Sequence, residues 1–252
     1  KGNIIKSGGT VVKNVTGYDL SKLVCGSYGT LIALTEITFK TLPAPKENNT
    51  LTIHNLNVET AIDLLGKSLS SSYDVSGAVF FPNGPECKGC VMNVSETFKL
   101  NDLKYDVPYI AIRIEGSKNS INERLTKLKN ELKIKNYNVS ILENYQSSIF
   151  WNKVKNLEVF KSTENNIVRI VLPPSQSVKL IYQLQIKNFR YYIDWGGALI
   201  WLEIYKLTEE MFDSIRKKVV KNGGYVSMIK NSDYLPFVEE VFTINRDRFN
   251  IS

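Results

Sequence analysis

The order in which strand-like and helix-like patterns follow one another occurs twice along this chain, and this repeat constrains the fold more than any other feature. Runs of β-branched and aromatic residues predict strands, while apolar residues three and four positions apart predict helices. Between residues 50 and 143 the order is strand, helix, strand, strand, helix, strand, and residues 164–230 repeat it. Two tandem ferredoxin-like units of this kind predict an α+β fold with one antiparallel sheet and helices on one side.

Individual elements follow from the same patterns. The first unit is predicted to contain strands at 51–56, 77–81, 109–114 and 137–142, with helices at 58–69 and 120–132. The second is predicted to contain strands at 166–172, 189–195, 198–205 and 225–229, with helices at 178–186 and 208–222. A further helix is predicted between the units at 147–160. Ser175 is a candidate cap, and Gly196-Gly197 predicts a tight hairpin.

A proline-rich stretch separates these units from the start of the chain. Residues 34–42 have the β-branched composition of a strand, and the sequence PAPKENN then interrupts the pattern at 43–49. This composition is typical of a linker. We therefore predict two domains, at 1–46 and 47–252.

Composition limits the classes of partner. The formal net charge is +7, but Lys and Arg are spread along the chain, which favours a solvated surface over a nucleic-acid interface. No apolar run reaches the length of a membrane span. The three cysteines fit a reducing compartment. Cys87 and Cys90 have the spacing of half a metal knuckle, but no second pair is present, so we predict no metal site.

The segment VKNVTGYDLSKLVCGSYGTL at 12–31 has the composition of a binding loop. Its glycines allow the backbone to approach a ligand closely, and its amide, hydroxyl and lysine donors favour an anion such as a phosphate group. It does not match the P-loop or the dinucleotide fingerprint. From these residues alone, a glycine-rich connection without a ligand is an equal alternative.

The stretch GYDLSKLVCGSYGTLIALTEITFKTLP resembles the FAD-binding domain of vanillyl-alcohol-oxidase (VAO/PCMH) type flavoproteins. GGTVVKNVTGYD at 8–19, FW followed by VKN at 150–156, VR leading to LPPS at 168–175, and DWGGA leading to WL at 194–202 are similar to the FAD-binding subunits of bacterial glycolate oxidases. The resemblance implies that residues 1–46 are the C-terminal part of the FAD-binding domain, without its N-terminal lobe. Residues 47–252 would be the cap domain.

The resemblance also implies which residues contact FAD in the intact protein. They are Lys13, Asn14, Thr16, Gly17, Tyr18, Gly26, Ser27, Gly29, Thr30, Leu31, Ile32, Thr35 and Trp195. Tyr28 and Ile32 depart from the family pattern. Ile32 replaces a glycine, so the local turn is expected to differ if that position needs a positive φ.

By the same resemblance, Arg169 is the candidate catalytic cation that would hold a substrate carboxylate. The single histidine, His54, is expected to pack in a strand, and Asp19 is expected to cap the helix that starts at Leu20.

The family implies oxidation of a small 2-hydroxy acid by a complex with a homologous FAD-linked catalytic subunit and an iron–sulfur subunit. Electrons would pass toward the iron–sulfur subunit. The complex would be cytoplasmic, with peripheral association at the inner face of the membrane through partners. A non-catalytic assembly module with a vestigial flavin site is the alternative.

Overall fold

The computed structural model describes residues 2–9, 18–27, 29–82, 107–160, 165–184 and 189–231. The chain divides into two compact units, Lys1–Ala44 and Pro45–Ser252. This division falls within the linker-like stretch identified at 43–49 in the sequence. Each unit is described by itself below.

The Lys1–Ala44 unit contains one short helix, α1 (Leu20–Val24). The strand predicted at 34–42 is wrong, because these residues form no strand in the structure. Their β-branched and aromatic side chains are exposed, with Phe39 77% and Leu42 81% accessible. A strand needs a neighbour for its backbone groups and a surface for its apolar face, and the described part of this unit provides neither.

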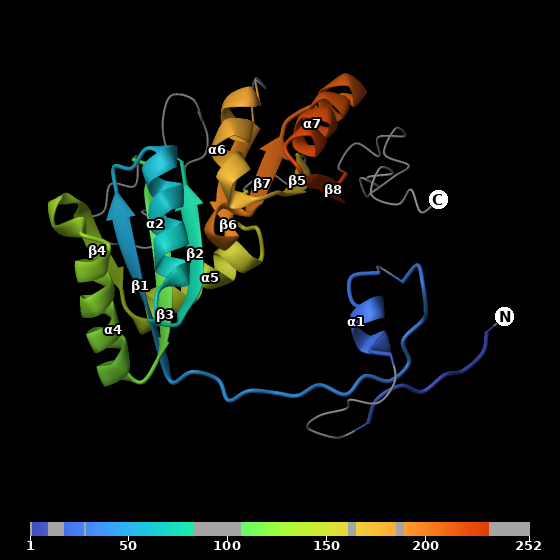
Figure 1. Cartoon of the computed structure of the whole chain (residues 1–252), viewed down its shortest axis with the longest axis horizontal. Helices are drawn as coiled ribbons and strands as arrows, with labels where there is room; N and C mark the ends of the chain where they lie inside the picture. Colours follow the sequence, from blue (N-terminus) through green and yellow to red (C-terminus); the bar gives the residue numbers. More distant parts are fainter. Residues whose placement is uncertain are drawn as a thin grey trace. The chain divides into compact units, whose positions relative to one another are not determined.

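The Pro45–Ser252 unit is built on one antiparallel sheet of eight strands, in the order β4-β1-β3-β2-β6-β7-β5-β8 (Figure 1). The first half consists of β1 (Glu47–His54), α2 (Val58–Ser70), β2 (Val75–Phe81), β3 (Tyr109–Gly116), α4 (Lys118–Glu131) and β4 (Asn138–Leu142). The second consists of β5 (Asn166–Val171), α6 (Pro174–Gln183), β6 (Phe189–Asp194), β7 (Leu199–Ile204), α7 (Glu209–Lys221) and β8 (Tyr225–Lys230). The predicted repeat and the α+β fold are confirmed.

The two halves join where β2 lies beside β6. The two strands pair antiparallel through Phe80 and Ile193, both of which are buried. β2 lies at one end of the strand order of the first half, and β6 lies at one end of the strand order of the second half. Because these two strands pair with each other, the sheet continues from one half to the other.

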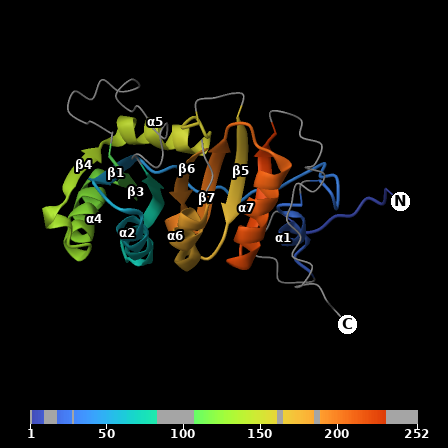
Figure 2. The same cartoon turned by 90° about the horizontal axis from the view of Figure 1, so that it is seen from above.

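Helices cover both faces of the sheet. Figure 2 shows α2, α4, α6 and α7 along one face and α5 (Asn144–Lys155) on the other. Alternation along β3 serves both layers: Ile110, Ile112 and Ile114 pack in the core under the four helices, while Tyr109 and Ala111 join the core under α5. The prediction of helices on one side therefore holds for the helices of the two units but not for α5.

Some element ends differ from the prediction. Ser175 is not the cap of α6, because the helix already begins at Pro174, a residue whose fixed φ suits the first helical turn. Helix α5 begins at Asn144, before the predicted start. Two short 3₁₀ segments, η2 (Ile134–Asn136) and η3 (Trp195–Gly197), were not predicted, and η3 forms the hairpin turn between β6 and β7.

Within the described residues, no helix combines the length and the apolar character that crossing a membrane would require.

Candidate functional site

The glycine-rich turn follows α1, and Asp19 fixes the start of that helix. The Asp19 carboxylate accepts a hydrogen bond from the backbone N of Lys22 at 3.2 Å and pairs with its Nζ at 3.1 Å. Hydrogen bonding with Lys22 lowers the pKa of Asp19. The prediction that Asp19 caps the helix is confirmed.

After α1 the backbone turns through Gly26 and Gly29, which have φ values of 83° and 77°. Among the described residues, no atom beyond their immediate neighbours lies within 4 Å of the place where a Cβ would stand on either glycine. The turn is closed by Ser27 N donating to Val24 O at 3.1 Å and Thr30 N donating to Ser27 O at 3.0 Å. Both glycines therefore adopt a conformation that suits glycine and leave space for a ligand to approach.

The turn also uses one of the predicted hydroxyl donors. Thr30 Oγ1 donates to Ser27 O at 2.7 Å, so a ligand would meet the lone pairs of this hydroxyl and not its proton. Ile32 is described and does not have a positive φ. An isoleucine in place of the family's glycine is therefore not strained by a positive φ at this position. The predicted contacts of Thr30 and Ile32 with FAD remain predictions.

The other predicted contact residues of this segment fall into two groups. Lys13, Asn14, Thr16 and Gly17 lie outside the described residues. Tyr18 and Leu31 are exposed, at 93% and 57%, and Thr35 is also exposed. The structure therefore brings no described side chain of this segment into a closed binding pocket, and their contact with FAD remains a prediction.

The predicted catalytic cation lies in the middle of the second half of the sheet. Arg169 on β5 stands opposite Trp201 of β7 and Ser227 of β8. Its guanidinium carbon lies 5.2 Å from the centre of the Trp195 ring, within the range of a cation–π contact. The structure thus brings together Arg169 and Trp195, two residues that the sequence singled out for different roles.

Trp195 reaches this position from the turn η3. The Asp194 carboxylate accepts a hydrogen bond from Trp195 N at 2.7 Å. Burial raises the pKa of Asp194, whereas the hydrogen bond from Trp195 and the positive charge of Arg113 oppose this rise. Burial likewise raises the pKa of Tyr192 well above its ordinary value, so its phenol stays protonated.

His54 packs in the core, as predicted. It is 2% exposed, its Nε2 lies 3.0 Å from Thr52 Oγ1, and its ring stacks on Tyr109 with the centroids 5.6 Å apart. Cys87 and Cys90 lie outside the described residues, and Cys25 is an exposed free thiol. In the parts of the chain that are described, no three His, Cys, Asp or Glu side chains gather as metal ligands would.

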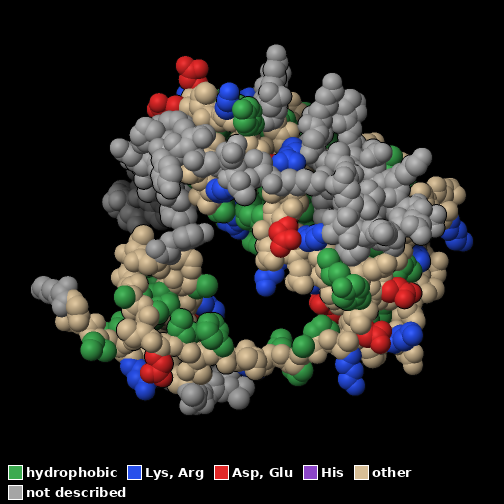
Figure 3. Space-filling view, turned by 180° about the vertical axis from the view of Figure 1, so that it is seen from behind, with side chains coloured by type: hydrophobic (Ala, Val, Ile, Leu, Met, Phe, Trp, Pro, Cys, Tyr) green, Lys and Arg blue, Asp and Glu red, His purple; other side chains and the backbone are tan. Residues whose placement is uncertain are grey.

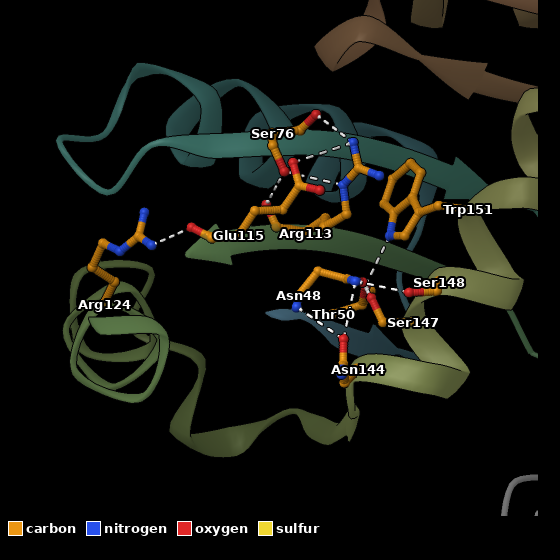
Figure 4. Close-up of polar contacts among 10 residues, drawn as sticks. All are labelled: Asn48, Thr50, Ser76, Arg113, Glu115, Arg124, Asn144, Ser147, Ser148 and Trp151. Carbon is orange, nitrogen blue, oxygen red and sulfur yellow. Dashed lines mark hydrogen bonds and ion pairs between the residues drawn. The ribbon is translucent and has the colours of Figure 1, made fainter. Parts of the chain in front are cut away.

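Sequence reasoning missed a polar network between α5 and the sheet (Figure 4). Trp151 Nε1 donates to Thr50 Oγ1 at 2.8 Å, and the Thr50 hydroxyl also lies 2.7 Å from Ser147 Oγ. Arg113 stacks over the Trp151 ring at 4.9 Å and donates from Nε to Ser76 Oγ at 3.0 Å. A lone Arg inside an apolar strand was the signal that could have indicated this network.

Sequence comparison finds relatives among hydroxy-acid oxidoreductases. The chain is 28% identical over 224 residues to glycolate oxidase subunit GlcE of Escherichia coli (strain K12). This alignment covers 88% of this chain and 50% of that protein. Over 60 residues it is 43% identical to glycolate oxidase subunit GlcD of Bacillus subtilis (strain 168), covering 24% of this chain and 13% of that one. Over 61 residues it is 48% identical to D-lactate dehydrogenase of Anaerostipes hadrus, with the same two coverages, 24% and 13%.

The chain is similar in sequence to subunits of glycolate oxidase and to FAD-linked oxidoreductases. No protein-family model matches it. The chain spans about half the length of the Escherichia coli relative.

The fold of the chain agrees with solved structures. Alkyldihydroxyacetonephosphate synthase, in two crystal forms, matches 84% of this chain and 46% of its own, with TM-scores of 0.55 and 0.58 and 13% sequence identity. At this identity the likeness shows the fold alone.

Proposed function

We propose that this chain is part of an FAD-binding subunit of a glycolate-oxidase-type complex, which oxidises a small 2-hydroxy acid and passes electrons toward an iron–sulfur partner. The similarity to GlcE along 88% of the chain supports the class of enzyme. The observation that carries the proposal is the guanidinium of Arg169 held beside the exposed ring of Trp195. A fixed cation next to a flat aromatic surface suits a small carboxylate that must be oriented for oxidation.

Arg169 would bind the substrate carboxylate. Its guanidinium presents paired N–H donors that match a carboxylate, and its place on a central strand limits its movement. The single histidine is buried among aromatic rings and is not placed to accept the hydroxyl proton of a substrate. We therefore propose that proton removal belongs mainly to a homologous FAD-linked subunit of the complex.

FAD, when bound, would supply the acceptor for the hydride. The described residues that fit this cofactor are Gly26 and Gly29, since both leave room beside the backbone. By the family resemblance, Trp195 is also proposed to contact FAD. The glycine-rich turn would contribute part of the site, and tight binding would need further protein surface around the cofactor.

The Lys1–Ala44 unit supports the need for a second surface. Its large apolar side chains are exposed, including Ile4 at 99%, Leu23 at 63% and Leu34 at 55%. Figure 3 shows hydrophobic side chains on the surface of this unit, at the lower left. So many exposed apolar groups mark an interaction surface. We propose that this segment is completed by further protein surface of an FAD-binding domain.

Surface charge gives no support to a nucleic-acid partner. On the side shown in Figure 3, the Lys and Arg side chains in view are dispersed among Asp and Glu. We therefore keep small 2-hydroxy acids and the other subunits as the proposed partners, in a cytoplasmic complex associated with the membrane through those subunits.

The proposal can be tested with Arg169→Ala and Arg169→Lys in the full-length subunit, assembled with its partners. Loss of a charge-assisted hydrogen bond should raise the KM for glycolate about 10- to 100-fold in the Ala variant, with a smaller rise for Lys. Dye reduction by the complex measures both constants. Lys179→Ala, which removes an exposed cation from α6 on the opposite side of the sheet, is the matched control.

Two outcomes would contradict the proposal. One is an unchanged KM in both Arg169 variants. The other is a full-length subunit that carries no visible flavin absorbance yet is still needed for the complex to assemble, which would favour the assembly module instead.

A further inference from the structure

The turn between β6 and β7 contains three successive residues with positive φ. They are Trp195 at 51°, Gly196 at 62° and Gly197 at 104°. Glycine adopts this region freely, but a bulky side chain there is strained by its Cβ. Among the six described non-glycine residues with positive φ, Trp195 is the only aromatic one. The bulky indole of Trp195 therefore sits on a backbone with positive φ, a conformation that residues other than glycine seldom adopt.

Burial does not explain this choice. The Trp195 side chain is 55% exposed, so the strain is not offset by a place in the core. A residue held in an unfavourable backbone region persists only when its surroundings over-determine it, and such residues cluster at ligand sites. What the conformation achieves is the position of the indole beside the Arg169 guanidinium.

The two glycines of the turn lie close to side chains of both halves of the unit. A Cβ on Gly196 would stand 2.5 Å from Leu69 Cδ1 of α2, and one on Gly197 would stand 3.2 Å from Ile62 Cγ2 and 3.3 Å from Pro174 Cβ. The two glycines thus pack closely against α2 of the first half, and Gly197 also packs against α6 of the second. Ala198 N closes the turn by donating to Trp195 O at 3.2 Å.

One polar group acts directly on the strained residue. Asp194 Oδ1 accepts from Trp195 N at 2.7 Å, and this hydrogen bond fixes the peptide that sets the direction of the indole. Arg113 of β3 supplies a nearby positive charge that favours the ionised carboxylate.

We propose that Asp194 is a positioning residue: it holds Trp195 in its strained turn so that the indole orients the Arg169 guanidinium for a carboxylate ligand. This inference rests on the proposed function for the identity of the ligand. The geometry itself can be tested without any ligand or cofactor.

The first experiment follows the Nε–Hε group of Arg169 by NMR in this chain. The ring current of the nearby indole should shift this proton upfield, and Trp195→Asn should abolish the shift. Asp194→Ala should reduce it strongly, and Asp194→Asn, which retains a carbonyl acceptor, should restore part of it. Asp63→Ala, an exposed carboxylate on α2, is the control and should leave the shift unchanged. A wild-type shift in Asp194→Ala would overturn the proposal.

The second experiment measures strain. Asn tolerates positive φ, so Trp195→Asn should unfold at a denaturant midpoint no lower than that of the wild type. Lys206 is an exposed residue with the same φ of 51°, so Lys206→Asn is the matched control and should show a similar relief of strain. A clear fall in the midpoint for Trp195→Asn alone would show that the ring is there for stability, and would overturn the proposal.

Kinetics of the assembled complex separate this inference from the proposed function. If both hold, Asp194→Ala raises the KM for glycolate several-fold more than it lowers kcat. If the NMR shift collapses while the KM stays unchanged, Asp194 still positions the pair, and it is the proposed substrate site that fails.

Discussion

His54 shows how a titratable side chain can take part in the packed core of the sheet. Its ring lies in a column of aromatic side chains, stacked on Tyr109, which in turn stacks on Phe81 with centroids 5.3 Å apart. The removal of the imidazole from water lowers the pKa of His54, because burial disfavours the charged form. The neutral ring is the form that fits this column.

This burial makes stability depend on pH with a definite sign. Below the ordinary histidine pKa of about 6.5, the unfolded chain binds a proton that the folded state does not. The free energy of unfolding should therefore fall as pH decreases from about 6.5 toward the lowered pKa of His54. Urea unfolding across this range, compared with His54→Phe, measures the effect. Equal pH slopes for the two proteins would contradict it.

At the scale of elements, the α5 helix is attached through Trp151. The indole donates to Thr50 on β1, stacks with Arg113 on β3, and covers Gly77 on β2, where an added Cβ would stand 2.8 Å from its Cη2. One side chain therefore ties the helix to three strands. Because the hydrogen bond to Thr50 holds the ring in place, the ring cannot move away from a larger residue at position 77.

Gly77→Ala should consequently lower the free energy of unfolding by about 1–3 kcal/mol, the usual cost of overpacking. Gly66→Ala is the matched control, since Gly66 is exposed in the middle of α2 and, apart from its chain neighbours and the backbone of its own helix, no described atom lies within 4 Å of the added Cβ. That variant should gain about 0.5–1 kcal/mol from helix propensity. Chemical denaturation measures both. A Gly77→Ala protein as stable as the wild type would mean that the Trp151 ring is not held.

The sequence predicted those elements whose pattern is local. Alternation in β3 and helical spacing in α2 were sufficient to predict both, and Asp19 was identified as a cap from its place before α1. The prediction of a strand at 34–42 failed because β propensity reports only that a side chain suits a sheet. A strand also needs a neighbouring strand to pair with, and propensity cannot show whether one is present. The face covered by α5 depends on Trp151 meeting Thr50, a contact between distant segments that no local pattern encodes.

The residues of the candidate site also divide into those that the sequence could predict and those that depend on contacts between distant segments. Gly26 and Gly29 were singled out because glycine permits the positive φ that both adopt, and Arg169 was found because it lies in a family-like motif. The pairing of Arg169 with Trp195 could not be predicted, because it needs the register of β5 against β7 and the strained turn that ends β6. Asp194 was overlooked because its role is a single hydrogen bond to the next residue.

At the scale of the whole sheet, the two halves share more than one strand contact. Phe81 of β2 and Tyr192 of β6 lie in one apolar cluster under α5, with ring centroids 5.3 Å apart. On the other face, Tyr182 of α6 donates to Glu59 of α2 at 2.7 Å. With the sheet continuous and apolar packing crossing the junction, we expect the two halves to unfold together.

Ile193→Val tests this at the junction. Removing one buried methyl group beside Phe80 should cost about 0.5–1.5 kcal/mol. If unfolding is cooperative, amide protection should fall by the same free energy in β1 and in β5, each in a different half. Ile229→Val, at a position 40% exposed on β8, should change stability by less than about 0.5 kcal/mol. Loss of protection confined to β5–β8 would show that the halves unfold independently.

The antiparallel pairing of β2 with β6 has a consequence for how far such a sheet can extend. Equivalent strands of two similar units meet antiparallel, which is the arrangement that a local twofold axis produces. An isologous contact of this kind uses the same edge of both units and so is closed: a third unit has no free copy of that edge to bind. The outer edges are the last strands of each unit, β4 and β8, and growth by this contact ends at two repeats.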